Sequence, residues 1–287
     1  MTGIRNFEVM GRSRMASALA ILVAGASCTG DAPGAQSSPS DQPTDVLPAA
    51  ILGMAGPLGG QSVSYFAEDD ATVGYLAVPS GAGPFPALIL IHEWNGLADR
   101  VREVADAMAA EGYVTLAADL YSGRTGSTPD ENMALVSEIG ADSETMIANL
   151  DAAARFLRER DDVTGRVGTL GWCFGGGVAL SYALGGEEHE ATAIFYGNLV
   201  TDPAILASID HEVYGSFAEM DTGIPPETVN EFVSALRAAG VENDVHIYDE
   251  VNHGFWLRID GNPELRTEPA LDAWQRLRGY LRRTLSD

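Results

Sequence analysis

Short apolar segments alternate with segments of helical periodicity along most of this 287-residue chain, and this alternation constrains the fold more than any other feature. Residues 143–159 place apolar side chains at spacings of three and four, whereas Ala87–Ile91 is apolar at every position. A strand that is apolar throughout fits a sheet covered by helices on both faces. The pattern therefore predicts a single α/β domain with a doubly wound, mostly parallel sheet flanked by helices.

The predicted elements begin near residue 61 and show no internal repeat. Strands are expected at Thr72–Val78, Ala87–Ile91, Val114–Ala118, Val167–Leu170, Ala191–Tyr196, Glu212–Phe217 and Val245–Tyr248. Helices are expected at Ala98–Ala110, Ser143–Glu159, Gly176–Leu184, Pro226–Ala239 and Thr267–Leu285.

The charge of the chain argues against two classes of partner. Acidic residues number 41 against 17 basic ones, all of them arginine, which gives a formal net charge of -24. Nucleic acids and anionic membrane surfaces attract clustered basic residues, so neither is an expected partner. Hydrophobic residues make up 46% of the chain, which is enough to bury a sizeable core.

The N-terminal region predicts export. Three arginines precede the apolar run 15–27, which is too short to span a bilayer but typical of a signal-peptide core. The sequence Gly25-Ala26-Ser27-Cys28 resembles the lipidation site of bacterial lipoproteins, and cleavage after Ala26 is the alternative. Residues 29–48 are rich in proline and small polar residues and lack aromatic residues, a composition typical of a flexible tether.

We therefore expect a signal peptide of lipoprotein type over 1–27, a tether over 28–48 that begins at a lipidated Cys28, and a catalytic domain over 49–287. The protein is expected in the periplasm or cell envelope, with a membrane contact only through this N-terminal lipid anchor.

The motif Gly171-Trp-Cys173-Phe-Gly175 lies between a predicted strand and a predicted helix. This is the arrangement of a nucleophile elbow, G-x-Nuc-x-G, with cysteine as the nucleophile. Side chains at the two glycines would collide with the neighbouring strand and helix. The helix N-terminus favours a thiolate at Cys173. The alternatives are a buried structural cysteine and a disulfide with Cys28 in the leader.

A catalytic acid and a histidine are expected later in the chain, in that order. Asp221 and His253 both follow predicted strands, at the carboxyl ends where sites of open α/β sheets gather. Glu219 and Asp249 are alternatives to Asp221. Four other histidines are alternatives to His253: we expect His189 and His211 to be solvated and His246 to be structural, while His92 lies in an early loop.

That early loop, His92-Glu-Trp-Asn-Gly96, follows the apolar strand Ala87–Ile91. In this position it would supply the Trp94 backbone N–H to an oxyanion hole, with the Phe174 N–H as the second donor. Glu93 would then point into the same cleft, and a solvated loop glutamate is the alternative. No spacing of His and Cys suggests a metal site, and no cofactor is expected.

Together these motifs, with Asp119-Leu-Tyr-Ser-Gly-Arg124 and Asn252-His-Gly-Phe255, resemble the dienelactone hydrolase family of α/β hydrolases over residues 61–285. The resemblance implies a triad of Cys173, Asp221 and His253. It also implies that Glu93 contacts the resting thiol and helps to activate it when substrate arrives. Tyr121, Arg124 and Arg258 are implied to grip a substrate carboxylate. The export signal and the apolar stretch Ala49–Gly60 depart from the family pattern.

The expected activity is hydrolysis of a small-molecule ester or lactone through an acyl-cysteine. A cysteine peptidase or acyltransferase with the same triad, and a binding protein that has lost catalysis, are the alternatives.

Overall fold

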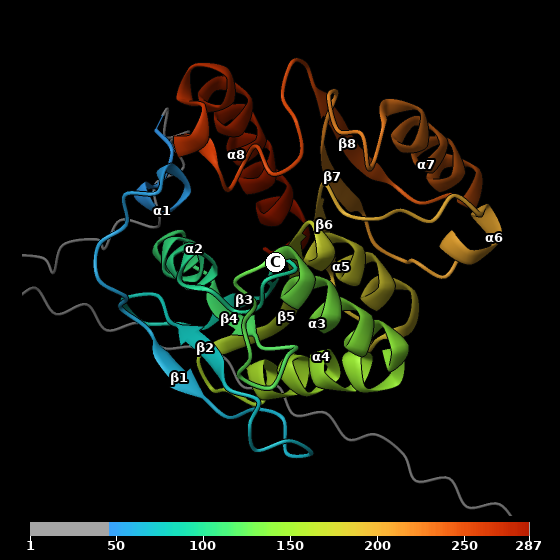
Figure 1. Ribbon diagram of the computed structural model, residues 1–287. Helices are drawn as coiled ribbons and strands as arrows, with labels where there is room; N and C mark the ends of the chain where they lie inside the picture. The colour runs from blue at the N-terminus through green and yellow to red at the C-terminus, as the bar shows by residue number, and fades with distance from the viewer. Residues whose placement is uncertain (1–45, 287) are drawn as a thin grey trace, which may run out of the picture. The chain divides into compact units, whose positions relative to one another are not determined.

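A sheet of eight strands forms the centre of the computed structural model, which describes residues 46–286 (Figure 1). Its order is β1-β2-β4-β3-β5-β6-β7-β8. The strands are β1 (Gln61–Val63), β2 (Gly74–Ala77), β3 (Phe85–Ile91), β4 (Val114–Ala118), β5 (Val163–Trp172), β6 (Ala191–Phe195), β7 (Val213–Ala218) and β8 (Asn243–Tyr248). The predicted signal peptide, Cys28 and the tether up to residue 45 lie outside the described residues.

The mostly parallel sheet predicted from the sequence is confirmed. The six strands from β4 to β8 pair in parallel, while β1 and β2 form an antiparallel extension at the β4 edge. Since parallel neighbours end at the same edge, the loops after β3, β4, β5, β7 and β8 meet there, and these loops carry the predicted site residues.

Helices cover both faces of the sheet, as a doubly wound fold requires (Figure 1). They are α1 (Ala49–Leu52), α2 (Asp99–Ala110), α3 (Pro129–Ala141), α4 (Ser143–Arg158), α5 (Phe174–Gly185), α6 (Pro203–Leu206), α7 (Pro226–Ala239) and α8 (Pro263–Leu285). In β3, Leu88 and Leu90 join an apolar cluster with α2 and α8, and Ile89 and Ile91 join one with α4 and α5. The uninterrupted apolar strand thus has two buried faces.

Two of the elements that the hydrophobic pattern did not predict are β1 and α3. The three residues of β1 are mostly exposed, so no buried face marks them. Helix α3 begins with a capping box between Thr128 and Glu131, and Pro129 is its first residue. Its only buried residues in the described structure are Asn132 and Leu135, so its apolar periodicity is weak.

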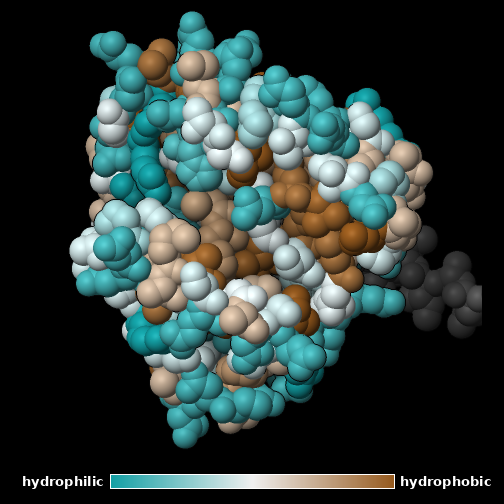
Figure 2. All heavy atoms as spheres, turned by 45° about the vertical axis from the view of Figure 1, so that its right-hand side comes forward, coloured by the Kyte–Doolittle hydropathy of each residue, from teal (hydrophilic) through white to brown (hydrophobic). Residues whose placement is uncertain are grey.

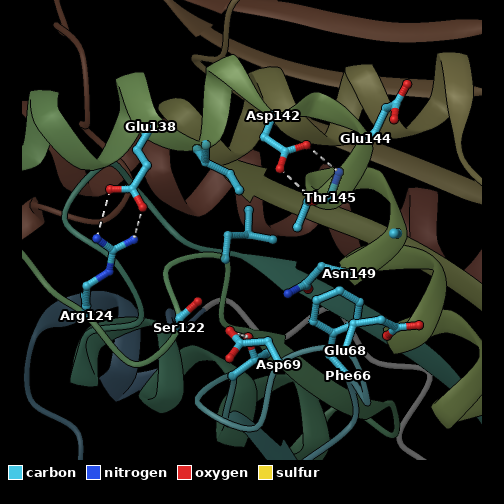
Figure 3. A pocket seen from close by; sticks show the side chains of 14 residues that line it. Phe66, Glu68, Asp69, Ser122, Arg124, Glu138, Asp142, Glu144, Thr145 and Asn149 are labelled. Atoms are coloured by element: carbon cyan, nitrogen blue, oxygen red, sulfur yellow. Dashed lines mark hydrogen bonds and ion pairs between the residues drawn. The ribbon is translucent and has the colours of Figure 1, made fainter.

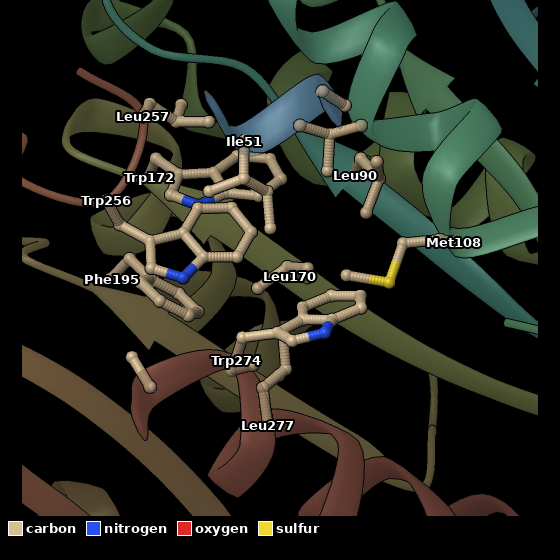
Figure 4. Packing of buried hydrophobic residues seen from close by; sticks show 14 of the residues in the cluster. Ile51, Leu90, Met108, Leu170, Trp172, Phe195, Trp256, Leu257, Trp274 and Leu277 are labelled. Carbon is tan, nitrogen blue, oxygen red and sulfur yellow. The ribbon is translucent and has the colours of Figure 1, made fainter. Parts of the chain in front are cut away.

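Three buried tryptophans connect the sheet to α8 and to the loop after β8 (Figure 4). The ring centroids of Trp172 and Trp256 lie 5.7 Å apart, and those of Trp256 and Trp274 lie 6.3 Å apart. Trp256 comes three residues after His253, so burial of its ring anchors the loop that carries this histidine.

The apolar stretch Ala49–Gly60 contains α1, which packs Ala50 and Ile51 into the same cluster as the tryptophans. Leu47, within the predicted tether, is also buried there. Within residues 46–286, no helix is both long enough and apolar enough to cross a membrane.

Candidate active site

Cys173 forms the sharp turn between β5 and α5. Its backbone angles, φ 56° and ψ -118°, lie in a region that non-glycine residues rarely adopt. The Cys173 N–H donates to the Phe195 carbonyl at 3.0 Å, and the Cys173 carbonyl accepts from the N–H groups of Gly176 and Gly177. Hydrogen bonds on both sides of the residue hold the strained turn in place, and the free thiol remains partly exposed.

The two motif glycines allow the close approach that the sequence predicted. A Cβ on Gly171 would lie 2.1 Å from the Gly175 carbonyl oxygen, and a Cβ on Gly175 would lie 2.2 Å from the Ile91 carbonyl oxygen. Backbone atoms cannot move aside to relieve such an overlap, whereas a flexible side chain can. The glycines therefore allow α5 to begin directly against the ends of β3 and β5.

Asp221 and His253 contact each other across the loops after β7 and β8. The His253 Nδ1–H donates to Asp221 Oδ2 at 2.6 Å, and Asp221 is 5% exposed. The other carboxylate oxygen of Asp221 accepts from the backbone N–H groups of Gly223 and Ile224. The carboxylate is thus fixed by its own turn, and it orients the imidazole.

The electrostatics of this pair favour the charged forms of both side chains. Burial alone would raise the pKa of Asp221, but hydrogen bonds from His253, Gly223 and Ile224 lower it. Burial alone would lower the pKa of His253, but the interactions with Asp221 and Cys173 raise it to about 10. An imidazolium between a carboxylate and the sulfur is therefore the stable arrangement.

The alternative acid Glu219 and the alternative histidines His189 and His211 have other partners. Glu219 accepts a hydrogen bond from the Glu250 N–H and does not orient the histidine. The prediction that His189 and His211 are solvated is wrong: His189 is 6% exposed, and both rings contact the Thr192 hydroxyl, at 2.9 and 2.8 Å. Their polar sequence neighbours do not report burial, because tertiary packing brings the two rings together, with centroids 4.7 Å apart.

Glu93 forms an ion pair with Arg258. The carboxylate Oε1 and the guanidinium Nη2 are 2.9 Å apart, and the Glu93 side chain is 11% exposed. Glu93 thus has a cationic partner in Arg258. Arg258 lies five residues after His253 in the sequence, so the fold brings its loop back to the loop after β3.

Two buried rings hold the loops after β3 and β4 together. The His92 Nδ1–H donates to the Glu93 carbonyl, and its Nε2 accepts from the Leu120 N–H, so the ring is neutral and not available as a base. Tyr121 packs between His92 and Phe174, with its hydroxyl at 3.3 Å from the Trp94 carbonyl. These contacts position the backbone of the early loop beside the start of α5.

Arg124 forms an ion pair with Glu138 of α3. Its guanidinium makes two hydrogen bonds to the Glu138 carboxylate, at 2.8 and 2.9 Å (Figure 3). The pair lines a cavity of about 470 Å³ between α3, α4 and the loop after β4. Cys173, Asp221 and His253 do not line this cavity.

Two residues that support His253, Tyr196 and Arg266, were not predicted from the sequence. Tyr196, directly after β6, is fully buried with φ 38°, and its ring centroid lies 5.0 Å from that of His253. Arg266 in α8 donates to the Asn252 side chain at 2.9 Å. Tyr196 ends a predicted strand, which is a sequence signal, whereas nothing local marks Arg266. Within residues 46–286, no cluster of three or more His, Cys, Asp or Glu could hold a metal.

The parallel sheet, the elbow and the adjacent aspartate–histidine pair define an α/β hydrolase. The dienelactone hydrolase family model matches residues 72–285, so this chain belongs to the dienelactone hydrolase family. It is a hydrolase of dienelactone hydrolase type.

The names of similar proteins agree with this family assignment. A Methylorubrum extorquens protein named "Putative carboxymethylenebutenolidase" is 34% identical over 230 residues, covering 75% of this chain and 78% of that protein. A crystal structure titled as a "Putative Dienelactone Hydrolase" from Klebsiella pneumoniae is 26% identical with a TM-score of 0.68, and covers 78% of this chain and 98% of that one. A metagenomic dienelactone hydrolase-like promiscuous phosphotriesterase is 21% identical with a TM-score of 0.70, covering 80% of this chain and 100% of that one, and shares the fold.

The close approach at the elbow predicts a large difference between two glycine substitutions in α5. Gly175→Ala should lower the free energy of unfolding by about 2 kcal/mol or more, because the new methyl group overlaps backbone oxygen. Gly185→Ala is the matched control, since a Cβ there meets nothing within 4 Å, and it should be neutral or stabilise by up to about 1 kcal/mol. Urea denaturation measures both, and equal effects would contradict the steric account.

The pKa of His253 predicts a pH dependence of stability. A histidine whose pKa rises from 6.5 to about 10 on folding stabilises fully below pH 6.5, and this contribution is lost as pH rises through about 10. The free energy of unfolding should therefore fall more steeply from pH 7 to 10 in the wild type than in His253→Gln. Urea titrations at several pH values measure the two slopes, and parallel curves would contradict the imidazolium.

Proposed function

We propose that this hydrolase cleaves ester or lactone bonds through a covalent acyl-cysteine on Cys173, with His253 as acid and base and Asp221 as its orienting partner. The observation that carries the proposal is the Asp221–His253 contact of 2.6 Å, directed at a partly exposed thiol on a strained elbow. Nucleophile, base and orienter form one connected set, as nucleophilic catalysis requires.

The first half of the reaction forms the acyl-cysteine. The Cys173 thiolate attacks the substrate carbonyl carbon, and the carbonyl oxygen becomes an oxyanion. The Phe174 N–H supports this step because Phe174 is the first residue of α5 and its N–H has no partner within the helix. The Trp94 N–H is the second donor in this proposal. As the tetrahedral intermediate collapses, the carbon–oxygen bond breaks and His253 gives its proton to the leaving alcohol.

The second half releases the acid. Neutral His253 takes a proton from water, and the resulting hydroxide equivalent attacks the thioester carbonyl. Collapse breaks the carbon–sulfur bond, and Cys173 leaves as a thiolate beside the imidazolium. A lactone yields one hydroxy acid in place of separate acid and alcohol. Because Glu93 is paired with Arg258, His253 balances the thiolate charge in this proposal.

Substitutions in the triad test the proposal. Cys173→Ala should abolish turnover of aryl esters and leave the far-ultraviolet spectrum unchanged. Asp221→Asn should lower kcat by up to about 10⁴, because the imidazole loses its orienting acceptor. Iodoacetamide should inactivate the wild type, and a full rate after alkylation would overturn the assignment.

The same assays separate the alternatives. Hydrolysis of small aryl esters and lactones that is lost on alkylation supports the proposal. Cleavage of peptides with no ester turnover would indicate a peptidase, and inactivity on all three classes would indicate a binding protein.

We also propose that the chain is exported and lipidated on Cys28, on the grounds of the basic and apolar leader and the small residues before Cys28. Expression of the full-length gene in a bacterial host should yield a membrane-associated protein whose N-terminal peptide begins at a diacylated Cys28. Cys28→Ser should yield no lipidated peptide. A soluble wild-type product beginning at residue 27 would support ordinary cleavage after Ala26 and contradict lipidation.

A further inference from the structure

We propose that His189, Thr192 and His211 form a hydrogen-bonded chain that holds one added proton and is weakened by a second, so that acid loosens the contact between the α5–β6 connection, β6 and the start of β7. We call these three residues the histidine chain. They lie outside the candidate active site, and the proposal does not depend on ester hydrolysis at Cys173. It follows from the number of hydrogens in the chain and from the charges around each ring.

The histidine chain joins three segments at the amino ends of β6 and β7. His189 lies in the connection between α5 and β6, Thr192 is in β6, and His211 lies two residues before β7. Hydrophilic side chains cover most of the surface visible in Figure 2, whereas His189 is 6% exposed and Thr192 is fully buried. Polar side chains so far removed from water need hydrogen-bond partners within the protein.

Four contacts follow one another along the chain. The His189 Nδ1 atom lies 3.0 Å from the Glu187 carbonyl oxygen, and its Nε2 atom lies 2.9 Å from the Thr192 hydroxyl. The His211 Nε2 atom lies 2.8 Å from the same hydroxyl, and its Nδ1 atom lies 3.2 Å from Asp210 Oδ1. Each contact needs one hydrogen, but two neutral imidazoles and one hydroxyl supply only three.

The buried end of the chain fixes where the three hydrogens of the neutral form lie. A carbonyl oxygen can only accept, so the His189 Nδ1–H donates to Glu187 and the His189 Nε2 must accept. The Thr192 hydroxyl therefore donates to His189 and accepts from the His211 Nε2–H. The His211 Nδ1 is then left without a hydrogen while it faces the Asp210 carboxylate. One added proton at this atom completes all four hydrogen bonds.

The charges around His211 favour this ring as the site of the first proton. Burial lowers the pKa of His211 below its ordinary value, but the Asp210 and Glu190 carboxylates act against this shift. Further charged groups line the surface cavity beside the ring, namely Glu212, Glu242 and Arg283. Carboxylates therefore outnumber cations around His211.

The surroundings of His189 oppose a second proton. Its ring packs against those of Tyr182 and His211, with centroids 4.8 and 4.7 Å away. Burial lowers the pKa of His189 to about 4, and the charges of His211 and Arg158 act in the same direction. Asp210 interacts with both rings, but its side chain is 72% exposed and is screened by water. A second proton would therefore put two cations side by side in a largely buried place.

Protonation of His189 also reverses its hydrogen bond to Thr192. A charged ring carries a hydrogen on Nε2, so it can no longer accept from the hydroxyl. The hydroxyl then faces two N–H donors, and its own hydrogen is left with Thr169, whose Oγ1 is 3.4 Å away. Arg158, which holds the α5–β6 connection to α4 through the Glu187 side chain, would be repelled by the new charge. The second proton therefore weakens the attachment of this connection to both β6 and α4.

Nuclear magnetic resonance of the histidine rings in the full chain tests the assignment, with each ring identified by its own His→Gln variant. At neutral pH, His189 should be neutral with its hydrogen on Nδ1. As the pH falls, the His211 signals should change first, and the His189 signals should change only near pH 4. A His189 hydrogen on Nε2, or a His189 ring that titrates before His211, would overturn the proposal.

Asp210→Asn tests the first proton. This substitution removes the carboxylate that faces His211, so half-protonation of His211 should move to lower pH, whereas the hydrogen of His189 should stay on Nδ1. A His211 titration that is the same in both proteins would contradict the charged contact that the proposal requires.

The second proton predicts a loss of stability in acid. The pKa of His189 falls from 6.5 to about 4 on folding, so its contribution to stability is complete above pH 6.5 and is lost as the pH falls toward about 4. Between pH 7 and 4.5, the unfolding equilibrium constant should rise roughly fiftyfold more in the wild type than in His189→Gln. Glutamine can keep both hydrogen bonds and takes up no proton, and urea denaturation measures both proteins.

His246→Gln is the matched control for this measurement. His246 is partly exposed on the edge strand β8, so its replacement should change the pH slope much less. Equal slopes in the wild type and His189→Gln would overturn the proposal. If His189→Gln does not fold, the remaining histidine variants still assign the wild-type rings, and the order in which His211 and His189 titrate decides the question.

Discussion

The close contact between the end of β5 and the start of α5 is the constraint on which the site depends. Gly171 and Gly175 let backbone approach backbone at distances that no side chain would permit. Cys173 lies in the turn between them in a strained backbone conformation. Hydrogen bonds to β6 and to the first turn of α5 hold it there. The same contact brings the helix N-terminus to the thiol, where its N–H groups favour negative charge.

The parallel sheet converts this local turn into a site. Loops after β3, β7 and β8 end at the same edge as β5, so Glu93, Asp221 and His253 come together from distant parts of the sequence. Each charge there has a partner: Asp221 holds His253, and Glu93 holds Arg258. These pairings let partly buried ionised groups persist in a protein with a large negative charge.

Burial of aromatic residues gives the site its rigidity. Trp256 fixes the histidine loop against Trp172 and Trp274, and Tyr196 packs against the imidazole itself. The His92 ring, although a titratable group near the site, is fully buried and serves to join two loops. Position near the elbow cysteine therefore does not by itself indicate a chemical role, since the hydrogen-bond partners of a ring determine what it can do.

The sequence by itself determined the α/β class, the mostly parallel sheet and the elbow at Cys173, because apolar periodicity and glycine placement act over a few residues. It also placed Asp221 and His253 among the candidates for the site, from their positions after strands. Only the tertiary structure decided that Asp221, and not Glu219, contacts the histidine, and only it showed that His189 is buried. It also paired Glu93 with Arg258, and Arg124 with Glu138. These outcomes depend on which loops meet in space, and ion pairs and burial between distant residues leave no periodic trace in the chain.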